Sequence, residues 1–331
     1  MYKESKQILE EIKKANRILL HCHPMPDPDS VCSALAMKFA LESLGKQVTV
    51  IKGDSDIPEA FMHFPGAHDI VKKNFHEINQ DDFDSFIVLD SASTVMISMK
   101  NTPVFPLSIK TISIDHHPTH TRFADINLVD DSSPATAFIL FNLLKELKIK
   151  INHDIAVNLL IGMYTDTGGF KYTLCDYRIL ESAGELARIA PDYTKAIFIM
   201  ENSENKDSLY FQGLALNSIK TYCNDNLVIS SVSYESLKEK NININLISSH
   251  TVANLLKSVI GWNIGISMVE IESNRVKISC RTRDSDKYNV SILAKTFDGG
   301  GHKSASGATL NMPLEQAVSK VVETAKVLYN L

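Results

Sequence analysis

Short apolar runs alternate with helix-like segments through the first half of the chain, and this alternation restricts the fold more than any other feature. Strand-like runs occur at 17–23 (RILLHCH), 47–51 (QVTVI), 85–90 (SFIVLD) and 111–115 (TISID), and helix-like segments at 30–44, 134–149 and 153–166. Apolar runs rich in β-branched residues are typical of parallel strands, and helices between them are typical of crossovers. We therefore predict an α/β fold whose N-terminal part is a doubly wound, mostly parallel sheet covered on both faces.

The pattern changes at 190–206, a stretch rich in polar and turn-favouring residues that we interpret as a helical linker. A smaller α+β domain is predicted after it. Its expected elements are helices at 207–222, near 245–257, at 290–297 and at the C-terminus, and strands at 226–233, 262–272 and 275–283. The 331 residues favour two domains over one. We divide them into a catalytic domain at 1–189, the linker, and a second domain at 207–331.

Composition excludes several classes of protein. The net charge of −5 argues against a partner as polyanionic as long duplex nucleic acid, although a short anionic substrate held by a few cations fits. The polar N-terminus lacks the apolar core of a signal peptide, and no apolar run is long enough to span a bilayer. The five cysteines are scattered, odd in number and without CxxC spacing, which indicates reduced thiols. We expect a cytoplasmic protein without a membrane partner.

Metal-competent side chains follow the predicted strands and the helix at 153–166. In an open parallel sheet, ligands bind beyond the carboxyl ends of the strands, so these side chains should meet at one edge. They are His23, Asp27, Asp29, Asp90, Asp115, His116, His117 and Asp166. Carboxylates and imidazoles suit divalent cations such as Mn²⁺, with Mg²⁺ as the alternative. So many donors exceed one ordinary site and fit two metals about 3.5–4 Å apart, with one carboxylate shared between them.

The stretch HPMPDPDS places three prolines among these candidate ligands. Pro24, Pro26 and Pro28 restrict the backbone, so we expect a stiff loop in which Asp27 and Asp29 face different metals. Asp29 or Ser30 is also expected to cap the helix that follows.

The motifs HPMPDPDS, VLDSAS, DHH and TDTGGF, in this order, resemble those of the DHH phosphoesterase superfamily. The resemblance implies that His23, Asp27 and Asp90 hold one metal. It implies that a second metal is held by Asp29, Asp90, His116 and Asp166, so that Asp90 is shared. Asp115 would orient His116, and His117 would contact the scissile phosphate.

The C-terminal stretch RTRDSDKYNVSILAKTFDGGGHKSASG resembles the DHHA1 substrate-binding domain. The resemblance implies that Arg281 and Arg283 grip phosphate and that His302 adds a contact. The glycines of the GGGH motif, Gly299, Gly300 and Gly301, would let backbone N–H groups approach a phosphate. The segment 190–206 would be the hinge on which the two domains close.

The family resemblance implies a phosphoric ester hydrolase of the nanoRNase and pAp-phosphatase type. Its substrates would be short single-stranded RNA and dinucleotides such as pApA or pGpG, cleaved from the 3′ end, or the 3′-phosphate of the nucleotide bisphosphate pAp. A cyclic di-AMP phosphodiesterase and an exopolyphosphatase are alternatives within the same chemistry. A nucleotide-binding regulator is the non-enzymatic alternative, and it predicts a missing metal ligand. A homodimer is plausible from the resemblance, without a sequence signal for it.

Several other residues have simpler interpretations. We expect His21 to be a structural residue and Trp262 to pack in the core. We expect solvent-exposed loop positions for four further histidines, namely His63, His68, His76 and His120.

Overall fold

Five parallel strands form the sheet of the N-terminal unit in this computed structural model, which describes residues 2–172 and 174–331. The strands are β1 (Arg17–His21), β2 (Gln47–Ile51), β3 (Ser85–Leu89), β4 (Lys110–Asp115) and β5 (Ile126–Val129). Their order is β2-β1-β3-β4-β5, and every neighbouring pair is parallel. The predicted parallel N-terminal sheet is confirmed, with β5 as an additional edge strand.

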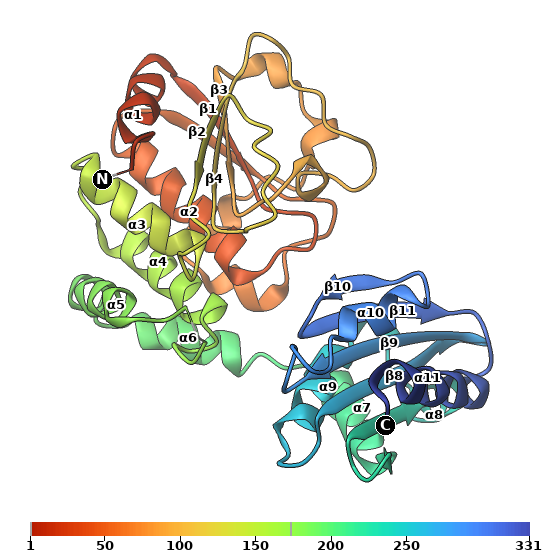
Figure 1. The fold of residues 1–331 in the computed structure, drawn as a ribbon. Coiled ribbons are helices and arrows are strands. Elements are labelled where there is room, and N and C mark those ends of the chain that lie inside the picture. The colour runs from red at the N-terminus through yellow and green to blue at the C-terminus, as the bar shows by residue number, and fades with distance from the viewer. Residues whose placement is uncertain (1, 173) are drawn as a thin grey trace. The chain divides into compact units, whose positions relative to one another are not determined.

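One face of this sheet is covered by helices (Figure 1). They are α1 (Ser5–Lys14), α2 (Pro28–Glu42), α3 (Thr136–Glu146), α4 (His153–Asp166) and α5 (Tyr177–Ile189). Apolar residues of these helices pack in one core with alternate strand residues such as Ile18, Leu20 and Ile87. The helix at 153–166 has the predicted bounds, whereas α5 had no counterpart in the sequence analysis.

The opposite face of the sheet is covered by irregular segments and short 3₁₀ turns, drawn in orange in Figure 1. Phe86 of β3 stacks on Phe75 with ring centroids 5.4 Å apart, and Phe105 packs edge-on against Phe75. Leu19 and Val88 complete this second core. Both faces are therefore buried, as the apolar strands require, but aromatic side chains on loops cover one of them in place of helices.

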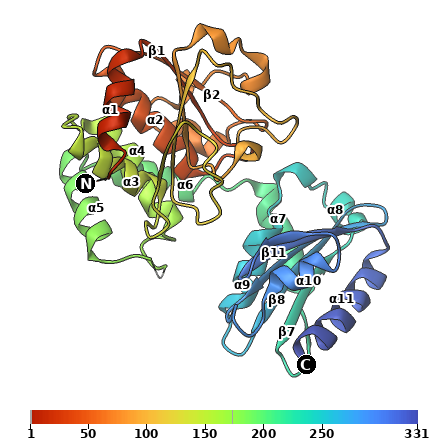
Figure 2. The same cartoon turned by 45° about the horizontal axis from the view of Figure 1, so that its top comes forward.

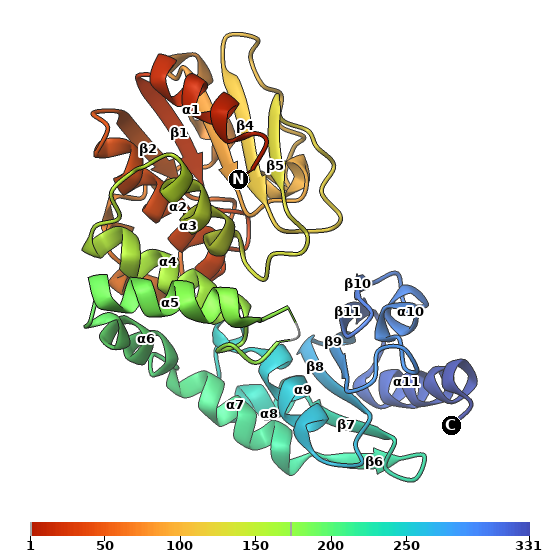
Figure 3. The same cartoon turned by 60° about the vertical axis from the view of Figure 1, so that its left-hand side comes forward.

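Helix α6 (Tyr193–Glu201) lies within the segment predicted as the linker. Tyr193, Ile197 and Met200 pack against the helical core of the N-terminal unit, and Figure 3 shows α4, α5 and α6 one below another. The chain divides into its two units between Ser203 and Glu204.

The C-terminal unit contains a six-stranded mixed sheet in the order β10-β11-β9-β8-β7-β6. Its strands are β6 (Lys220–Tyr222), β7 (Leu227–Val232), β8 (Ile264–Glu272), β9 (Arg275–Thr282), β10 (Gly300–His302) and β11 (Ala305–Leu310). Helices α7 (Lys206–Asn217), α8 (Tyr234–Glu239) and α9 (Ser249–Ser258) cover one face, and α10 (Val290–Lys295) and α11 (Leu314–Tyr329) the other (Figure 2). The predicted α+β domain is confirmed, but residues 220–222 form a strand where we expected the end of a helix.

The order of the N-terminal strands places a topological switch between β1 and β3. The chain leaves β1 toward β2 on one side and leaves β3 toward β4 on the other. Crevices at the carboxyl ends of strands form at such switch points. The segments after β1, β3 and β4 carry five of the six predicted metal ligands, and the sixth, Asp166, ends α4.

Candidate metal centre

The loop after β1 is held in place by its neighbours and by the helix it enters. Asp27 is the N-cap of α2 and accepts a hydrogen bond from Ser30 N at 2.9 Å, with Pro28 at the first helical position. We expected Asp29 or Ser30 to cap α2, but Pro28 suits the first turn, so the cap is Asp27, two residues before Asp29. A Cβ at Gly53 would lie 2.4 Å from the carbonyl oxygen of His23, so only glycine allows this close approach.

Asp29 connects α2 to α3. Its side chain is buried, and its two oxygens accept hydrogen bonds from Thr136 N at 2.7 Å and Ala137 N at 3.1 Å. These N–H groups belong to the first turn of α3, whose positive end favours a carboxylate. Asp29 therefore caps α3 through space, a contact between residues more than a hundred positions apart that sequence reasoning missed.

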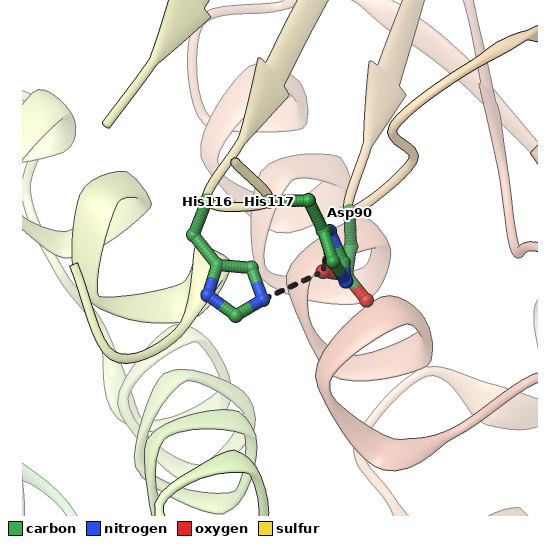
Figure 4. A group of neighbouring side chains, drawn as sticks. All are labelled: Asp90, His116 and His117. Carbon is green, nitrogen blue, oxygen red and sulfur yellow. Dashed lines mark ion pairs between the residues drawn. The ribbon is translucent and has the colours of Figure 1, made fainter. Parts of the chain in front are cut away.

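Asp90 follows β3 and lies at the centre of the cluster. It is 3% exposed, and its backbone is left-handed with φ of 55°, a conformation that few non-glycine residues adopt, aspartate more often than most. Its Oδ1 accepts a hydrogen bond from Thr136 Oγ1 at 2.9 Å and lies 3.7 Å from His116 Nε2. Figure 4 shows Asp90 facing His116 and His117.

The structure brings together all six predicted metal ligands, in two sets that a third group, Asp90, His116 and His117, connects. His23, Asp27 and Asp90 form one set, with His23 Nε2 3.2 Å from Asp27 Oδ2 and 3.9 Å from Asp90 Oδ2. Asp29, His116 and Asp166 form the other, with His116 Nε2 3.3 Å from Asp166 Oδ2. Within each set the potential donor atoms lie within 4.8 Å of one another. Since Asp90 is close to His116 too, its carboxylate lies between the two sets.

The electrostatics of this cluster call for a cation. Burial, then the charges of nearby carboxylates, raises the pKa of Asp29 and of Asp90 well above the usual range. Burial also raises the pKa of Asp166. Burial acts in the same direction on Asp27, but the hydrogen bond and charge of His23 outweigh it and lower the pKa of Asp27. Divalent cations would allow all four carboxylates to ionise, so the donor set fits Mn²⁺ or Mg²⁺.

Asp115 orients His117 and not His116, which corrects our expectation. Its Oδ1 lies 2.8 Å from His117 Nδ1, whereas His116 Nδ1 lies 3.3 Å from the carbonyl oxygen of Ser133. Asp115 points toward the second of the two histidines because adjacent residues leave the strand in different directions. Burial opposes the charged form of His117, but the hydrogen bond and charge of Asp115 outweigh it and raise the pKa of His117.

In the C-terminal unit, Arg281 and Gly299 line a pocket of about 670 Å³ over β9 and β11. A Cβ at Gly299 would lie 2.2 Å from Gly307 O, and Gly301 has φ of 134°. The local backbone structure therefore favours glycine at both positions, whether or not a ligand binds there. A Cβ at Gly300 would meet nothing within 4 Å, which leaves its backbone open to a ligand. His302 is exposed on β10.

Arg283 has a contact that the sequence did not predict. Its Nη1 lies within hydrogen-bond distance of the carbonyl oxygens of Lys257, Ser258 and Val259, at 3.0–3.1 Å. These carbonyls end helix α9, where a cation satisfies acceptors and complements the helix dipole. The contact gives Arg283 a structural role, and its grip on phosphate stays a prediction.

Two family models match this chain. The model "DHH family, N-terminal domain" matches residues 17–163, and the model "DHHA1 domain" matches residues 224–329. The protein is a DHH–DHHA1 protein. The first match contains the strand ends that carry His23, Asp90 and His116, and the second contains Arg281 and the GGGH motif.

Relatives of the DHH–DHHA1 chain extend over nearly its whole length. A Thermus thermophilus protein named bifunctional oligoribonuclease and PAP phosphatase NrnA is 26% identical over 330 residues, covering 98% of this chain and 94% of the relative. The crystal structure of an exopolyphosphatase-related protein from Bacteroides fragilis has a TM-score of 0.88 at 24% identity, covering 99% of this chain and 98% of that one. The exonuclease RecJ bound to manganese has a TM-score of 0.51 at 14% identity, over 99% of this chain and 94% of that one. These two structures support the fold.

The other histidines of the DHH domain lie outside the two donor sets. His21 is buried, with Nε2 3.1 Å from Met96 O, as expected for a structural residue, and burial lowers its pKa to about 4. His120 is half-buried where we expected exposure, because its Nε2 lies 2.9 Å from Ser113 Oγ and its ring stacks on Phe123. The exposed loop histidines are, as predicted, His63, His68 and His76.

Sequence reasoning missed Lys277, which lines the same pocket of the DHHA1 domain as Arg281. Both residues lie on β9, four positions apart, and alternate strand residues share a face. The spacing of Lys277 and Arg281 in the sequence KISCR was the signal from which Lys277 could have been predicted.

Trp262 is partly buried against the core beneath α7 and α9, in agreement with the expected packing role. Among the described residues, no helix has the length and apolar character needed to cross a membrane.

Proposed function

We propose that this DHH–DHHA1 protein is a metal-dependent phosphoesterase acting on short nucleotides. The proposed reactions are removal of mononucleotides from the 3′ end of dinucleotides and short RNA, and removal of the 3′-phosphate of pAp. The observation that carries the proposal is the convergence of three carboxylates and two imidazoles around the buried carboxylate of Asp90. The relative from Thermus thermophilus, whose name states both activities, supports this choice of substrate class.

The residues present fit two divalent cations, with Mn²⁺ favoured by the mixture of imidazole and carboxylate donors. His23, Asp27 and Asp90 would hold one ion, and Asp29, Asp90, His116 and Asp166 would hold the other. When bound, such a pair of ions supplies Lewis-acid chemistry and lowers the pKa of a water that attacks phosphorus. Within the protein, Thr136 fixes the orientation of Asp90 by donating to its Oδ1.

His117 is proposed to contact the scissile phosphate. It is half-buried beside Asp90, and the buried carboxylate of Asp115 holds its Nδ1 side, so that Nε2 is left for a substrate. The raised pKa of His117 favours the protonated ring near neutral pH, which would stabilise negative charge that develops on phosphate oxygens.

The DHHA1 domain is proposed to hold the rest of the substrate. Arg281 lines the pocket over β9 and β11, beside Gly299 and near the open backbone of Gly300. A guanidinium can bind a phosphate through two parallel hydrogen bonds, and the exposed His302 would add a side-chain contact.

The described cysteines are free thiols, which supports our proposal that the protein works in the reducing cytoplasm.

A hydrolysis panel with the purified full-length protein and Mn²⁺ tests this function. It compares pAp, pApA, a pentanucleotide RNA, a long RNA, cyclic di-AMP and polyphosphate at equal phosphate concentration. We expect turnover of pApA, the pentanucleotide or pAp to exceed that of the long RNA. Preference for cyclic di-AMP or polyphosphate would replace the proposed substrate, and metal binding without any turnover would support a nucleotide-binding regulator.

A further inference from the structure

A tight turn follows Asp166 at the end of α4. Three consecutive residues, Gly168, Gly169 and Phe170, have left-handed φ angles of 62°, 71° and 62°. The first two are glycines, for which this conformation has no steric cost, but for Phe170 it is strained. The surrounding contacts must therefore hold the turn in this shape.

Thr167 supplies those contacts. Its buried hydroxyl donates to Met163 O at 2.7 Å and accepts from Phe170 N at 2.9 Å. Its carbonyl oxygen accepts from Lys171 N at 3.0 Å and from Tyr172 N at 3.1 Å. The backbone is thus fixed from the metal-cluster residue Asp166 through to Tyr172.

The turn places the ring of Tyr172 on Gly168. A Cβ at Gly168 would lie 2.5 Å from Cζ of Tyr172 and 2.6 and 2.9 Å from its Cε atoms. Because the hydroxyl oxygen is not among the nearest atoms, the glycine lies over the face of the ring and not against its edge. Tyr172 is nevertheless 62% exposed, so the opposite face of the ring is open to solvent.

The neighbouring aromatic residues of this turn are engaged elsewhere. Phe170 packs against the helical core, and the hydroxyl of Tyr164 donates to Glu201 at 2.5 Å. For the hydroxyl of Tyr172, no partner is found among the residues that the structure describes. An aromatic ring held on a rigid turn, with one face supported and the other open, has the features of a stacking platform.

We propose that Tyr172 is the platform on which a base adjacent to the scissile phosphate stacks. This inference rests on the proposed function, because it requires a nucleotide phosphate at the metal centre. Gly168, which supports the ring, is only two residues from Asp166, so a base next to that phosphate is within reach of Tyr172. Every base has an aromatic face, so the platform recognises the presence of a base more than its identity.

The test compares a substrate that has a base with one that lacks it. Wild type, Tyr172→Ala and Tyr172→Phe are assayed with Mn²⁺ on pAp or pApA, whichever wild type hydrolyses, and on the matching abasic analogue. We expect Tyr172→Ala to raise KM for the natural substrate about 5- to 100-fold, as for loss of one stacked base, with little change in kcat. KM for the abasic analogue should not change, and Tyr172→Phe should retain wild-type values.

Two glycine variants provide a matched pair. Gly168→Ala and Gly169→Ala both place a side chain on a left-handed residue of the same turn. Only the Cβ at Gly168 would collide with the tyrosine ring, whereas the Cβ at Gly169 has its nearest contact at 3.4 Å, with Tyr164. We expect Gly168→Ala to reproduce the KM effect of Tyr172→Ala and Gly169→Ala to differ from wild type far less.

Calorimetric titration with 5′-AMP in the presence of Mn²⁺ separates this inference from the proposed function. If wild type hydrolyses nothing, the proposed function fails, while weaker AMP binding by Tyr172→Ala would still support stacking. If wild type is active but Tyr172→Ala changes neither AMP binding nor the ratio of the two KM values, the platform is contradicted. Equal losses on the natural and abasic substrates would also overturn it.

Discussion

At the scale of single residues, the chemistry of this protein depends on carboxylates held where they would not ionise easily without a cation. Burial first, and then the charges of nearby carboxylates, raises the pKa of both Asp29 and Asp90. Hydrogen bonds from Thr136 to each of them fix their positions before any metal binds. Rigid placement of ligands in this manner is a requirement for a specific metal site.

Asp90→Asn should separate metal binding from folding. The raised pKa means that the folded state binds this proton more tightly than the unfolded state, so the metal-free protein loses stability as pH rises above about 4. An asparagine does not ionise, so the variant avoids this loss of stability, and we expect metal-free Asp90→Asn to have a higher Tm than metal-free wild type at alkaline pH. The substitution should also remove most of the Tm increase caused by Mn²⁺ and leave no more than a few per cent of activity.

Thermal melts with EDTA and with Mn²⁺, together with initial rates at saturating Mn²⁺, measure these effects. A variant that keeps wild-type activity would show that Asp90 is not shared between two ions.

Asp115→Asn should change the pH dependence of the reaction. Asp115 raises the pKa of His117, so removing its charge lowers the pH at which His117 loses its proton. We expect the alkaline limb of the kcat profile to move to lower pH and kcat at neutral pH to fall about 10- to 100-fold. Asp125→Asn is the control, because Asp125 accepts hydrogen bonds from Thr111, which lies near the start of the strand that ends at Asp115. An unmoved alkaline limb in Asp115→Asn would exclude protonated His117 from the reaction.

At the scale of elements, helix α4 is packed so closely on the centre that it has room only for glycine at one position. A Cβ at Gly162 would lie 2.6 Å from Asp29 Oδ1 and 2.7 Å from the Cβ of Ala137. Helices α2, α3 and α4 therefore meet at the carboxylate of Asp29.

Gly162→Ala should weaken Mn²⁺ binding and lower the free energy of unfolding, because Asp29 must move. The matched control is Gly184→Ala in α5, where a Cβ would meet nothing within 4 Å. That change should raise the free energy of unfolding by about 0.5–1 kcal/mol and leave the Mn²⁺ affinity unchanged. Chemical denaturation and Mn²⁺ titration measure both variants. Wild-type Mn²⁺ affinity in Gly162→Ala would contradict the role of Asp29.

Substitution of Arg281, on β9, and of Arg283, directly after β9, should have different effects on KM and on stability. Arg281→Ala should raise KM for pApA without changing metal content, because Arg281 lines the pocket of the DHHA1 domain. Arg283→Ala should leave KM nearly unchanged and lower the free energy of unfolding by about 0.5–1 kcal/mol, through loss of the contacts that end α9. Steady-state kinetics and urea denaturation distinguish the two, and equal increases in KM would restore Arg283 to the phosphate site.

At the scale of the whole molecule, the sequence predicted the parts of the fold that follow from local pattern. Motifs at strand ends identified five of the six candidate metal ligands, because parallel strands bring their carboxyl ends to one edge, and the motif at the end of α4 identified Asp166. Contacts through space were not predictable in this way. Asp29 caps a helix over a hundred residues away, and Asp115 selects His117 over its neighbour by direction alone. Aromatic residues of the irregular segments, such as Phe75, cover one face of the sheet. Their sequence has no helical periodicity from which this packing could be predicted.

The most direct test of the central claim is the release of AMP from pApA by metal-stripped protein as Mn²⁺ is added. We predict no AMP without metal and a rate that rises to saturation with Mn²⁺, with Asp90→Asn at no more than a few per cent of the wild-type rate throughout. Release of AMP that does not depend on metal, or no release when Mn²⁺ is demonstrably bound, would contradict hydrolysis at the Asp90 centre.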